Sequence, residues 1–171
     1  MVLNYYGDDI SEETLYRSGK LPGHKGRWDV KIAPVLIKRG YDVASYWNGG
    51  LKAWRLKPVT IRSFNIAYAK AKKMGFTHKI RASLSIIKRL VGQGTPVIAE
   101  VDADHFYGGT FGVTHVILIV GYDSNNLIVH DPEKNLGARF RKVPYQLFKR
   151  SWERLAGLAG RSMIVIKKAQ D

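Results

Sequence analysis

Apolar and polar positions follow helical spacing in some segments of the chain and two-residue alternation in others. Apolar residues three or four positions apart are typical of a helix with one buried face, whereas short alternating or continuous apolar runs are typical of strands. Helices are predicted in DDISEETLYRSG (8–19), RWDVKIAPVLIKRG (27–40), TIRSFNIAYAKAKKMG (60–75), IRASLSIIKRLVGQG (80–94) and YQLFKRSWERL (145–155). Strands are predicted in YDVASYW (41–47), TPVIAEVD (95–102), the hairpin THVILIVGYDSNNLIVHDP (114–132), RFRKV (139–143) and SMIVIKK (162–168).

Residues that favour helix ends support several of these boundaries. Ser11 can cap the helix that follows it, and Gly19 lies just past the end of that helix. Two longer helices are expected to stop at Gly75 and Gly92. Pro34 lacks the amide hydrogen that a helix interior requires, so we expect it in the first turn of its helix or at a bend.

The order of elements, helices first and then mostly strands, predicts an α+β fold. We expect helices to pack on a mostly antiparallel sheet. A length of 171 residues is typical of one domain, so residues 1–171 are expected to form a single domain. The chain contains no cysteine, which excludes disulfides and thiolate metal sites within it.

The predicted hairpin carries His115 near its beginning and Asp131 near its end. If the hairpin folds symmetrically about Asp123, His115 and Asp131 face each other on the same side of the two strands. A carboxylate there can accept a hydrogen bond from one imidazole nitrogen, which leaves the other nitrogen free to act as a base. The alternative is a structural cross-strand pair, or a register that places the two side chains on opposite faces.

Three stretches of the chain resemble papain-like cysteine peptidases, and in particular the branch of the double-glycine leader peptidases of bacteriocin exporters. MVLNYYGDDISEETL resembles the end of the nucleophile helix and the short helix after it, and LVGQGTPVIAEVD resembles the strand that leads toward the histidine. THVILIVGYDSNNLIVHDP, the most specific of the three, resembles the segment that carries the catalytic histidine and aspartate. The resemblance implies a papain-like fold, peptide-bond cleavage as the family chemistry, and catalytic roles for His115 and Asp131.

In that family the nucleophilic cysteine opens a helix, whose N-terminus and a nearby imidazolium lower the pKa of the thiol. The resemblance places this cysteine about two helical turns before Met1, so the chain is expected to lack the start of its nucleophile helix. Two explanations stay open: a degenerate peptidase fold that binds or scaffolds without cleaving, or a sequence that begins at an internal methionine. Under both, we expect these 171 residues to be catalytically inactive on their own.

Other site chemistries have weaker support in the sequence. The hydroxyls of Ser45, Thr110 and Thr114 are not at the helix N-terminus that the family uses for its nucleophile. A divalent ion could bind Asp102, Asp104 and His105, although an acidic loop after a strand is more often a turn. We therefore expect no metal and no cofactor.

The glycine-rich loop FYGGTFGVTH (106–115) is expected to border the cleft beside the histidine. Glycines in such a loop allow a substrate backbone to approach closely. The residues expected to line the cleft are Tyr107, Gly112 and Thr114.

The charge is uneven, with a formal net charge of +14 and no Asp or Glu between Ala44 and Ala99. The basic residues between positions 52 and 89 could attract an anionic partner, and together with Trp47 and Trp54 they leave nucleic-acid binding open. The alternative interpretation of the positive charge is a solvated surface that keeps the domain soluble. A peptide or protein substrate is the other expected partner.

The longest apolar run is too short for a membrane helix, and MVLNYYGDDISEE lacks the pattern of a secretory signal. The compartment is left open, with the cytoplasm as the default expectation. Apolar Val2, Leu3 and Tyr6 in the N-terminal helix stub need cover. We expect that cover from the sheet or from a second chain, which would make the protein an oligomer.

Overall fold

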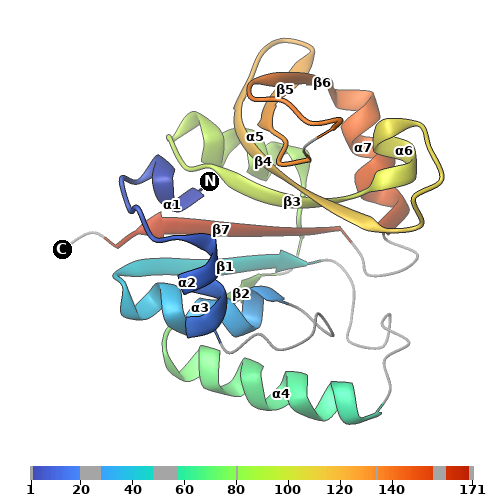
Figure 1. The fold of residues 1–171 in the computed structure, drawn as a ribbon. Coiled ribbons are helices and arrows are strands. Elements are labelled where there is room, and N and C mark those ends of the chain that lie inside the picture. The colour runs from blue at the N-terminus through green and yellow to red at the C-terminus, as the bar shows by residue number, and fades with distance from the viewer. Residues whose placement is uncertain are drawn as a thin grey trace. The chain divides into compact units, whose positions relative to one another are not determined.

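The computed structural model describes residues 2–19, 28–47, 58–79, 81–133, 135–155 and 161–169, and these residues form helices and strands of an α+β fold (Figure 1). The chain divides into two compact units. Unit 1 comprises residues 1–45, 55–78 and 166–171, and unit 2 comprises residues 46–54 and 79–165. Whether residues 1–171 behave as a single domain stays a prediction.

Unit 1 carries most of the predicted helices. It contains α1 (Val2–Tyr5), α2 (Glu12–Ser18), α3 (Trp28–Lys38), most of β1 (Tyr41–Trp47), α4 (Pro58–Lys73), most of β2 (Thr77–Lys79) and the last part of β7 (Ser162–Lys168). Helix α3 packs against both α2 and α4 (Figure 1). The strand order in this part of the sheet is β2-β1-β7.

The helix ends of unit 1 follow the sequence signals, with one exception. The Ser11 side chain accepts a hydrogen bond from the Thr14 amide, and Gly19 follows the last residue of α2. Pro34 lies inside α3, beyond its first turn, so of the two expectations the first-turn position was wrong and a bend stays a prediction. Its neighbours Ala33 and Leu36 are fully or almost fully buried, and this burial offsets the lost backbone hydrogen bond.

The N-terminal helix stub is partly covered within unit 1. Leu3 is buried, and the Tyr6 hydroxyl donates a 2.8 Å hydrogen bond to the carbonyl of Ile166 in β7. Burial and the neighbouring tyrosines Tyr5 and Tyr41 raise the pKa of Tyr6 to about 12, so the hydroxyl keeps its proton. Strand β7 therefore covers part of the N-terminal helix stub, as expected if the sheet and not a second chain provides the cover. An oligomer stays a prediction.

Unit 2 contains the antiparallel strands that the sequence predicts. Its elements are α5 (Leu84–Gly92), β3 (Val97–Asp102), α6 (Ala103–Tyr107), β4 (Thr114–Tyr122), β5 (Asn126–His130), β6 (Arg141–Pro144) and α7 (Tyr145–Arg154), together with the first part of β7. The strand order is β7-β3-β4-β5-β6, and each neighbouring pair is antiparallel. Helix α5 packs on β3 and β4, and α7 packs on β3, β5 and β6 (Figure 1).

One face of this sheet is fully buried at its centre. Ala99, Ile117, Ile119 and Val129 have no exposed surface. Alternation along a strand places His115 on the same face as Ile117, and it places Asp131 on the same face as Val129. His115 and Asp131 therefore lie on the same face of the sheet as the buried core residues of unit 2.

The elements missed from the sequence are short. Strand β2 has three residues and α6 has five, too few for either pattern to repeat. Trp54, the basic residues 52–57 and the side chains of residues 58–64 lie outside the described residues. No helix of the described ranges combines the length and the apolar character needed to cross a membrane.

Candidate functional site: a histidine and a buried aspartate

The β4–β5 hairpin has a different register from the one expected. Leu118 pairs with His130 and Ile119 with Val129, whereas the symmetric fold about Asp123 required Leu118 to face Ile128. The pairing nearest the turn, Tyr122 with Leu127, already departs from the symmetric fold, and a bulge between Ile119 and Gly121 shifts it by one residue. Continuing the register would place Ile117 opposite Asp131. His115 lies two residues before Ile117, near the start of β4. Since residues two apart on a strand share a face, the two side chains still meet, diagonally.

The expected contact between the two side chains is present. Nε2 of His115 lies 2.8 Å from Oδ1 of Asp131. The Asp131 side chain is fully buried, and the His115 side chain is 15% exposed. A carboxylate without a proton can only accept, so Nε2 carries the hydrogen and donates it. In neutral His115, Nδ1 is then a free acceptor, and no residue in the described part of the chain bonds to it.

Asp131 accepts hydrogen bonds from several donors besides the imidazole. The Tyr107 hydroxyl lies 2.8 Å from both carboxylate oxygens, and Nη1 of Arg141 donates to Oδ2 at 3.1 Å. The amide of Glu133 donates to Oδ1 at 3.1 Å. Burial by itself would raise the pKa of Asp131, but the hydrogen bonds from Tyr107, Glu133 and His115 outweigh it and lower the pKa. Asp131 is therefore an ionised carboxylate in a closed set of donors.

Tyr107 and Arg141 are held by each other as well as by the carboxylate. The Arg141 guanidinium lies over the rings of Phe106 and Tyr107, at 4.8 and 5.4 Å from their centroids. Burial raises the pKa of Tyr107, and its hydrogen bond to Asp131 raises it further, so the phenol remains a donor. The imidazole of His115 packs against Tyr107, with ring centroids 5.3 Å apart.

The loop after Asp131 is closed by its own backbone. The Asp131 amide donates to the carbonyl of Ala138 at 3.0 Å, and the Gly137 amide donates to the carbonyl of Glu133 at 2.8 Å. A Cβ atom on Gly137 would lie 2.5 Å from the Asp131 carbonyl oxygen and 2.9 Å from its Oδ1. Only glycine fits this position without a shift of the loop that holds the carboxylate.

The other predicted site residues are divided between this cluster and the loop before it. Tyr107 donates directly to Asp131, and its expected role in lining a cleft stays a prediction. Gly112 and Thr114 are exposed, and Gly112 has a positive φ of 64° and donates to Oδ1 of Asp104 at 2.9 Å. Their role in lining a cleft stays a prediction.

The acidic residues considered for a metal bond to the short helix α6 and to the loop after it. Oδ1 of Asp102 accepts hydrogen bonds from the amide and from Nδ1 of His105, both at 2.9 Å. Asp104 accepts from the amides of Phe111 and Gly112. Among the described residues, no group of three or more His, Asp or Glu side chains could hold a metal ion.

The sequence did not point to Arg141 as a site residue, and it did not predict the hydrogen bond from Tyr107 to Asp131. Arg141 begins β6 and reaches Asp131 because β6 pairs with β5, with Val129 opposite Arg141. An arginine ten positions after an aspartate carries no signal by itself. The available signal was the predicted strand RFRKV, since a strand next to β5 brings its first residues close to the end of β5.

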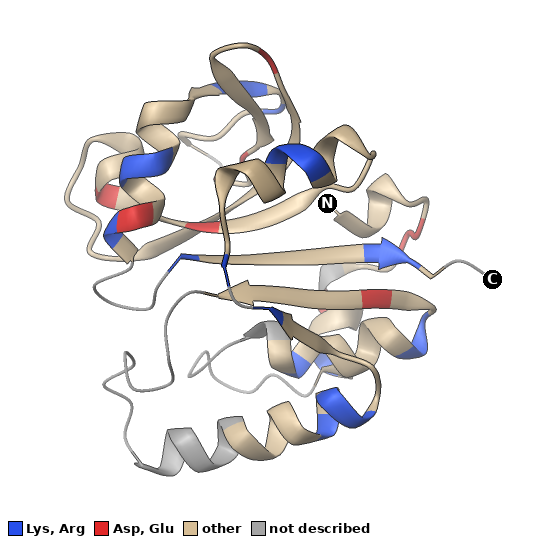
Figure 2. Ribbon diagram, turned by 180° about the vertical axis from the view of Figure 1, so that it is seen from behind, with Lys and Arg blue, Asp and Glu red and all other residues tan. Residues whose placement is uncertain are grey.

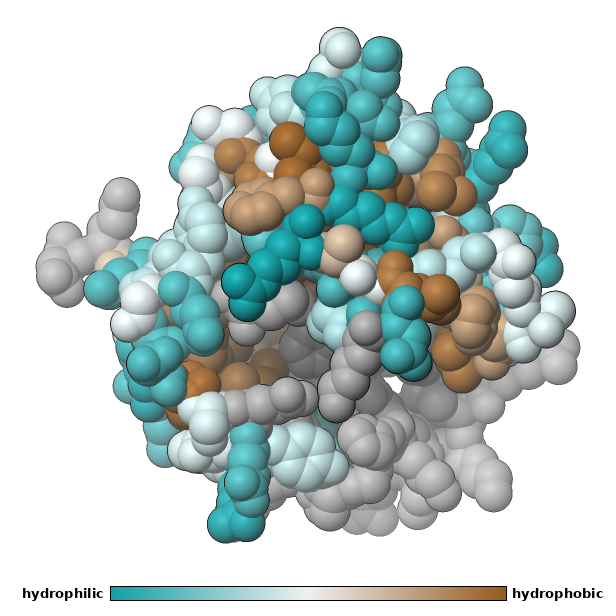
Figure 3. Space-filling view, turned by 45° about the horizontal axis from the view of Figure 1, so that its top comes forward, coloured by the Kyte–Doolittle hydropathy of each residue, from teal (hydrophilic) through white to brown (hydrophobic). Residues whose placement is uncertain are grey.

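Exposed apolar side chains lie in the loops on both sides of the pair. Phe111 and Val113 precede His115, and Leu136 and Phe140 follow Asp131. Each is between 46% and 66% exposed. Figure 3 shows hydrophobic side chains interrupting the hydrophilic surface. Apolar groups beside a polar site are a common feature of surfaces that bind peptides or other ligands.

The model of the Peptidase_C39 like family matches residues 1–160. The structure is similar to the peptidase domain of Streptococcus ComA, a bifunctional ABC transporter of a quorum-sensing pathway. That match has a TM-score of 0.53 and 16% identity, and it covers 99% of this chain and 85% of the other. A protein described as a C39-like peptidase from Bacillus anthracis matches with a TM-score of 0.36 and 21% identity. That match covers 52% of this chain and about half, 49%, of the other. No curated protein matches the chain.

Proposed function

Because the chain belongs to the Peptidase_C39 like family, we propose that His115 and Asp131 are the base and the orienting acid of a papain-like thiol peptidase site. The observation that carries the proposal is the hydrogen bond from Nε2 of His115 to the buried Asp131 carboxylate. Since Nε2 is the donor, Nδ1 is the nitrogen that can take a proton from a thiol. Tyr107 and Arg141 are positioning residues, because they act on the imidazole through the carboxylate.

The chemistry follows from this arrangement once a thiol lies next to Nδ1. The imidazole removes the thiol proton, and the thiolate attacks the carbonyl carbon of the scissile peptide bond. The imidazolium then returns the proton to the leaving amine, which breaks the bond and leaves an acyl-enzyme for water to hydrolyse. The ionised Asp131 stabilises the imidazolium in between.

The 171 residues contain no cysteine, so we propose that they do not cleave peptides by themselves. Cleavage would need a thiol from outside this sequence. The substrate class that the proposal implies is a peptide, and the exposed apolar residues beside the pair suit apolar side chains of such a peptide.

The test is to fuse a helix-forming segment that carries Cys-Gly-Pro in front of Met1 and to measure the hydrolysis of a double-glycine leader peptide. We expect cleavage that is lost when the added cysteine is serine and when His115 is alanine. The control is His105→Ala, which removes a histidine of the same unit that bonds to a different aspartate. Cleavage that persists in His115→Ala, or its absence from the cysteine-bearing protein, contradicts the catalytic assignment.

The second candidate is a peptide-binding module without catalysis. It is favoured by the combination of a braced His–Asp pair with a sequence that has no thiol. Under this reading the unextended chain binds a leader peptide, and binding is weakened by substitutions at exposed Val113 and Phe111. Titration calorimetry with the unextended chain distinguishes the two, because a purely catalytic reading does not require this binding to be tight.

A further inference from the structure

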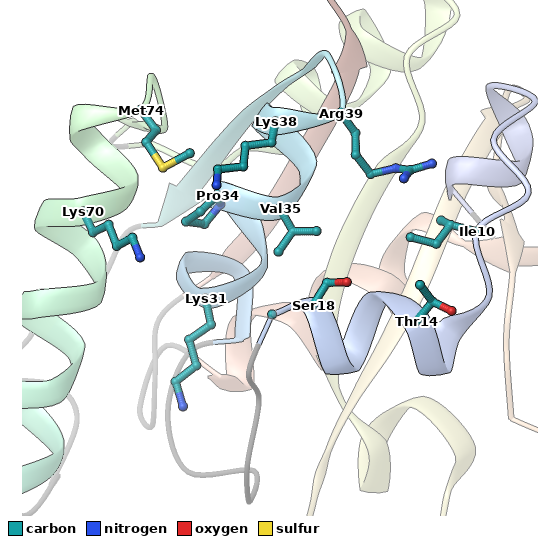
Figure 4. Close-up of a pocket in the computed structure, with 11 residues that line it drawn as sticks. Ile10, Thr14, Ser18, Lys31, Pro34, Val35, Lys38, Arg39, Lys70 and Met74 are labelled. Carbon is teal, nitrogen blue, oxygen red and sulfur yellow. The ribbon is translucent and has the colours of Figure 1, made fainter.

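Unit 1 contains a pocket that has no part in the His–Asp site. It lies among α2, α3 and α4, and its volume is about 640 Å³ (Figure 4). Eleven residues line it: Ile10, Thr14, Ser18, Gly19, Lys31, Pro34, Val35, Lys38, Arg39, Lys70 and Met74. All of them belong to unit 1. The lining contains four basic side chains and no acidic one.

Three of the basic side chains form no ion pair with any side chain that the structure describes. Lys31 and Lys38 come from α3 and Lys70 comes from α4 (Figure 4). Lys70 also belongs to a group of lysines in the last turn of α4, which Figure 2 shows in blue. Three ammonium groups beside one pocket create a local positive potential that an anion would neutralise.

The fourth basic side chain is already paired. The Arg39 guanidinium donates to both oxygens of Asp8, at 3.0 and 2.6 Å, and the Tyr41 hydroxyl donates to the same carboxylate at 3.1 Å. The Arg39 hydrogen bond holds the pKa of Asp8 below its usual value. Arg39 is therefore a fixed part of the wall, and the three lysines are the groups available to a ligand.

The rest of the lining decides which kind of anion fits. Ile10, Pro34, Val35 and Met74 are apolar, and Ser18 adds a hydroxyl from the end of α2. The backbone amide of Gly19 is used inside α2, where it donates to Arg17 and Leu15. Phosphate sites commonly use free backbone amides at a helix N-terminus, or a bidentate arginine, and the Gly19 amide and Arg39 are both engaged here. Flexible ammonium groups can each pair with a carboxylate, and the apolar lining can contact an apolar group. The lining therefore favours a ligand that carries both several carboxylates and an apolar group.

We propose that this pocket binds an acidic peptide segment, with its carboxylates at Lys31, Lys38 and Lys70 and an apolar side chain against Val35 and Met74. The proposal does not depend on the peptidase assignment, since it uses neither His115 nor Asp131. The pocket is a binding site in unit 1, and the His–Asp pair is the candidate reaction site in unit 2.

The test uses a short fluorescein-labelled peptide that alternates glutamate and leucine, measured by fluorescence anisotropy at low salt. We expect the triple variant Lys31→Ala/Lys38→Ala/Lys70→Ala to raise the dissociation constant roughly tenfold or more, because three ion pairs are lost. The matched control is Lys72→Ala/Lys73→Ala/Lys168→Ala, which removes the same charge from unit 1 at residues outside the pocket lining. That control should change the dissociation constant less than about twofold.

The remaining arms test the ligand chemistry. A peptide with glutamine in place of glutamate should bind far more weakly than the acidic peptide. His115→Ala should leave binding of the acidic peptide unchanged, which separates this site from the proposed function. Equal losses in the two triple variants, or equal binding of the glutamine peptide, overturn the proposal. A random oligonucleotide that binds through the three lysines, in a protein that does not bind the acidic peptide, also overturns it. Circular dichroism and thermal unfolding check that each variant is folded.

Discussion

The described part of unit 2 contains two histidine–aspartate pairs whose distances are almost equal and whose surroundings differ. His115 bonds to Asp131 through Nε2 at 2.8 Å, and His105 bonds to Asp102 through Nδ1 at 2.9 Å. The first pair is sixteen residues apart and the second only three. The His105 side chain is 39% exposed, compared with 15% for His115. A short distance between an imidazole and a carboxylate therefore does not identify a reactive pair.

The partners of the two carboxylates explain the difference. Asp102 caps α6 and bonds to His105 in the first turn of that helix, and its long-range contact is a 3.9 Å ion pair with the exposed Arg154 side chain. Asp131 is fully buried and is held by Tyr107, Arg141 and a backbone amide from separate parts of the fold. Both imidazoles have one nitrogen engaged, but only His115 is bonded to a carboxylate that is fully buried and held by several other donors. The comparison predicts unequal responses to equivalent substitutions.

The largest effect is expected for Asp131→Ala. It leaves the Tyr107 hydroxyl and the Arg141 guanidinium without their shared acceptor, and we expect the free energy of unfolding to fall by about 3 kcal/mol. Asp102→Ala removes a helix cap and should cost about 1 kcal/mol. Urea denaturation of both variants measures the difference. Equal losses would mean that Asp131 is no more than a local cap.

Tyr107→Phe should have the next largest effect. The substitution removes a hydrogen bond to an ionised carboxylate and should lower the free energy of unfolding by about 2 kcal/mol. In the cysteine-bearing protein it should also lower kcat more than it raises KM, because Tyr107 positions the imidazole through Asp131. Tyr122→Phe is the matched control, since Tyr122 is 41% exposed, and it should stay within about 0.5 kcal/mol.

Acid should weaken the contribution of Asp131. Its pKa in the folded protein lies below the usual value of 3.8, so the folded state favours the ionised form. The resulting stabilisation is complete above that value and is lost as the pH falls through the folded pKa. The difference in unfolding free energy between the wild-type protein and Asp131→Asn should therefore be smaller at about pH 2 than at about pH 5. A difference that stays the same or grows between these two pH values would contradict an ionised Asp131.

The smallest effect is expected from the histidines themselves. His115→Ala should lower the free energy of unfolding by about 1 kcal/mol, because it removes one of several donors to Asp131 and a partly buried ring. His105→Ala changes an exposed ring and should cost less than about 0.5 kcal/mol. If His105→Ala is the more damaging of the two, the assignment of the structural and the candidate catalytic pair is reversed.

Much of this fold could be predicted from the sequence, because its long elements have clear periodicity and end signals. Ser11 and Gly19 bound α2 as predicted, and the strand around Ile117 has a continuous apolar run from Val116 to Val120. The short helix α6 could not be found in this way. Its five residues are stabilised by the Asp102 cap and by the burial of Phe106, and neither feature repeats along the sequence.

The contact between His115 and Asp131 was predicted correctly, but the register that led to it was wrong. The pairing already differs from the symmetric one at the turn, where Tyr122 faces Leu127, and a bulge between Ile119 and Gly121 shifts it by one residue. The diagonal geometry preserves the contact because both residues stay on the same face. The bonds from Tyr107 and Arg141 were missed, since they depend on how α6 and β6 pack around the carboxylate.

The proposed catalytic role of His115 depends most directly on which of its ring nitrogens carries the hydrogen. Long-range ¹H–¹⁵N correlation spectra of the uniformly labelled protein, recorded where imidazoles are neutral, report the tautomer of each ring, and single histidine variants assign the signals. We predict the Nε2–H tautomer for His115 and the Nδ1–H tautomer for His105, because each bonded nitrogen faces an ionised carboxylate. A His115 ring protonated at Nδ1 would leave no base for a thiol and would contradict the proposed site.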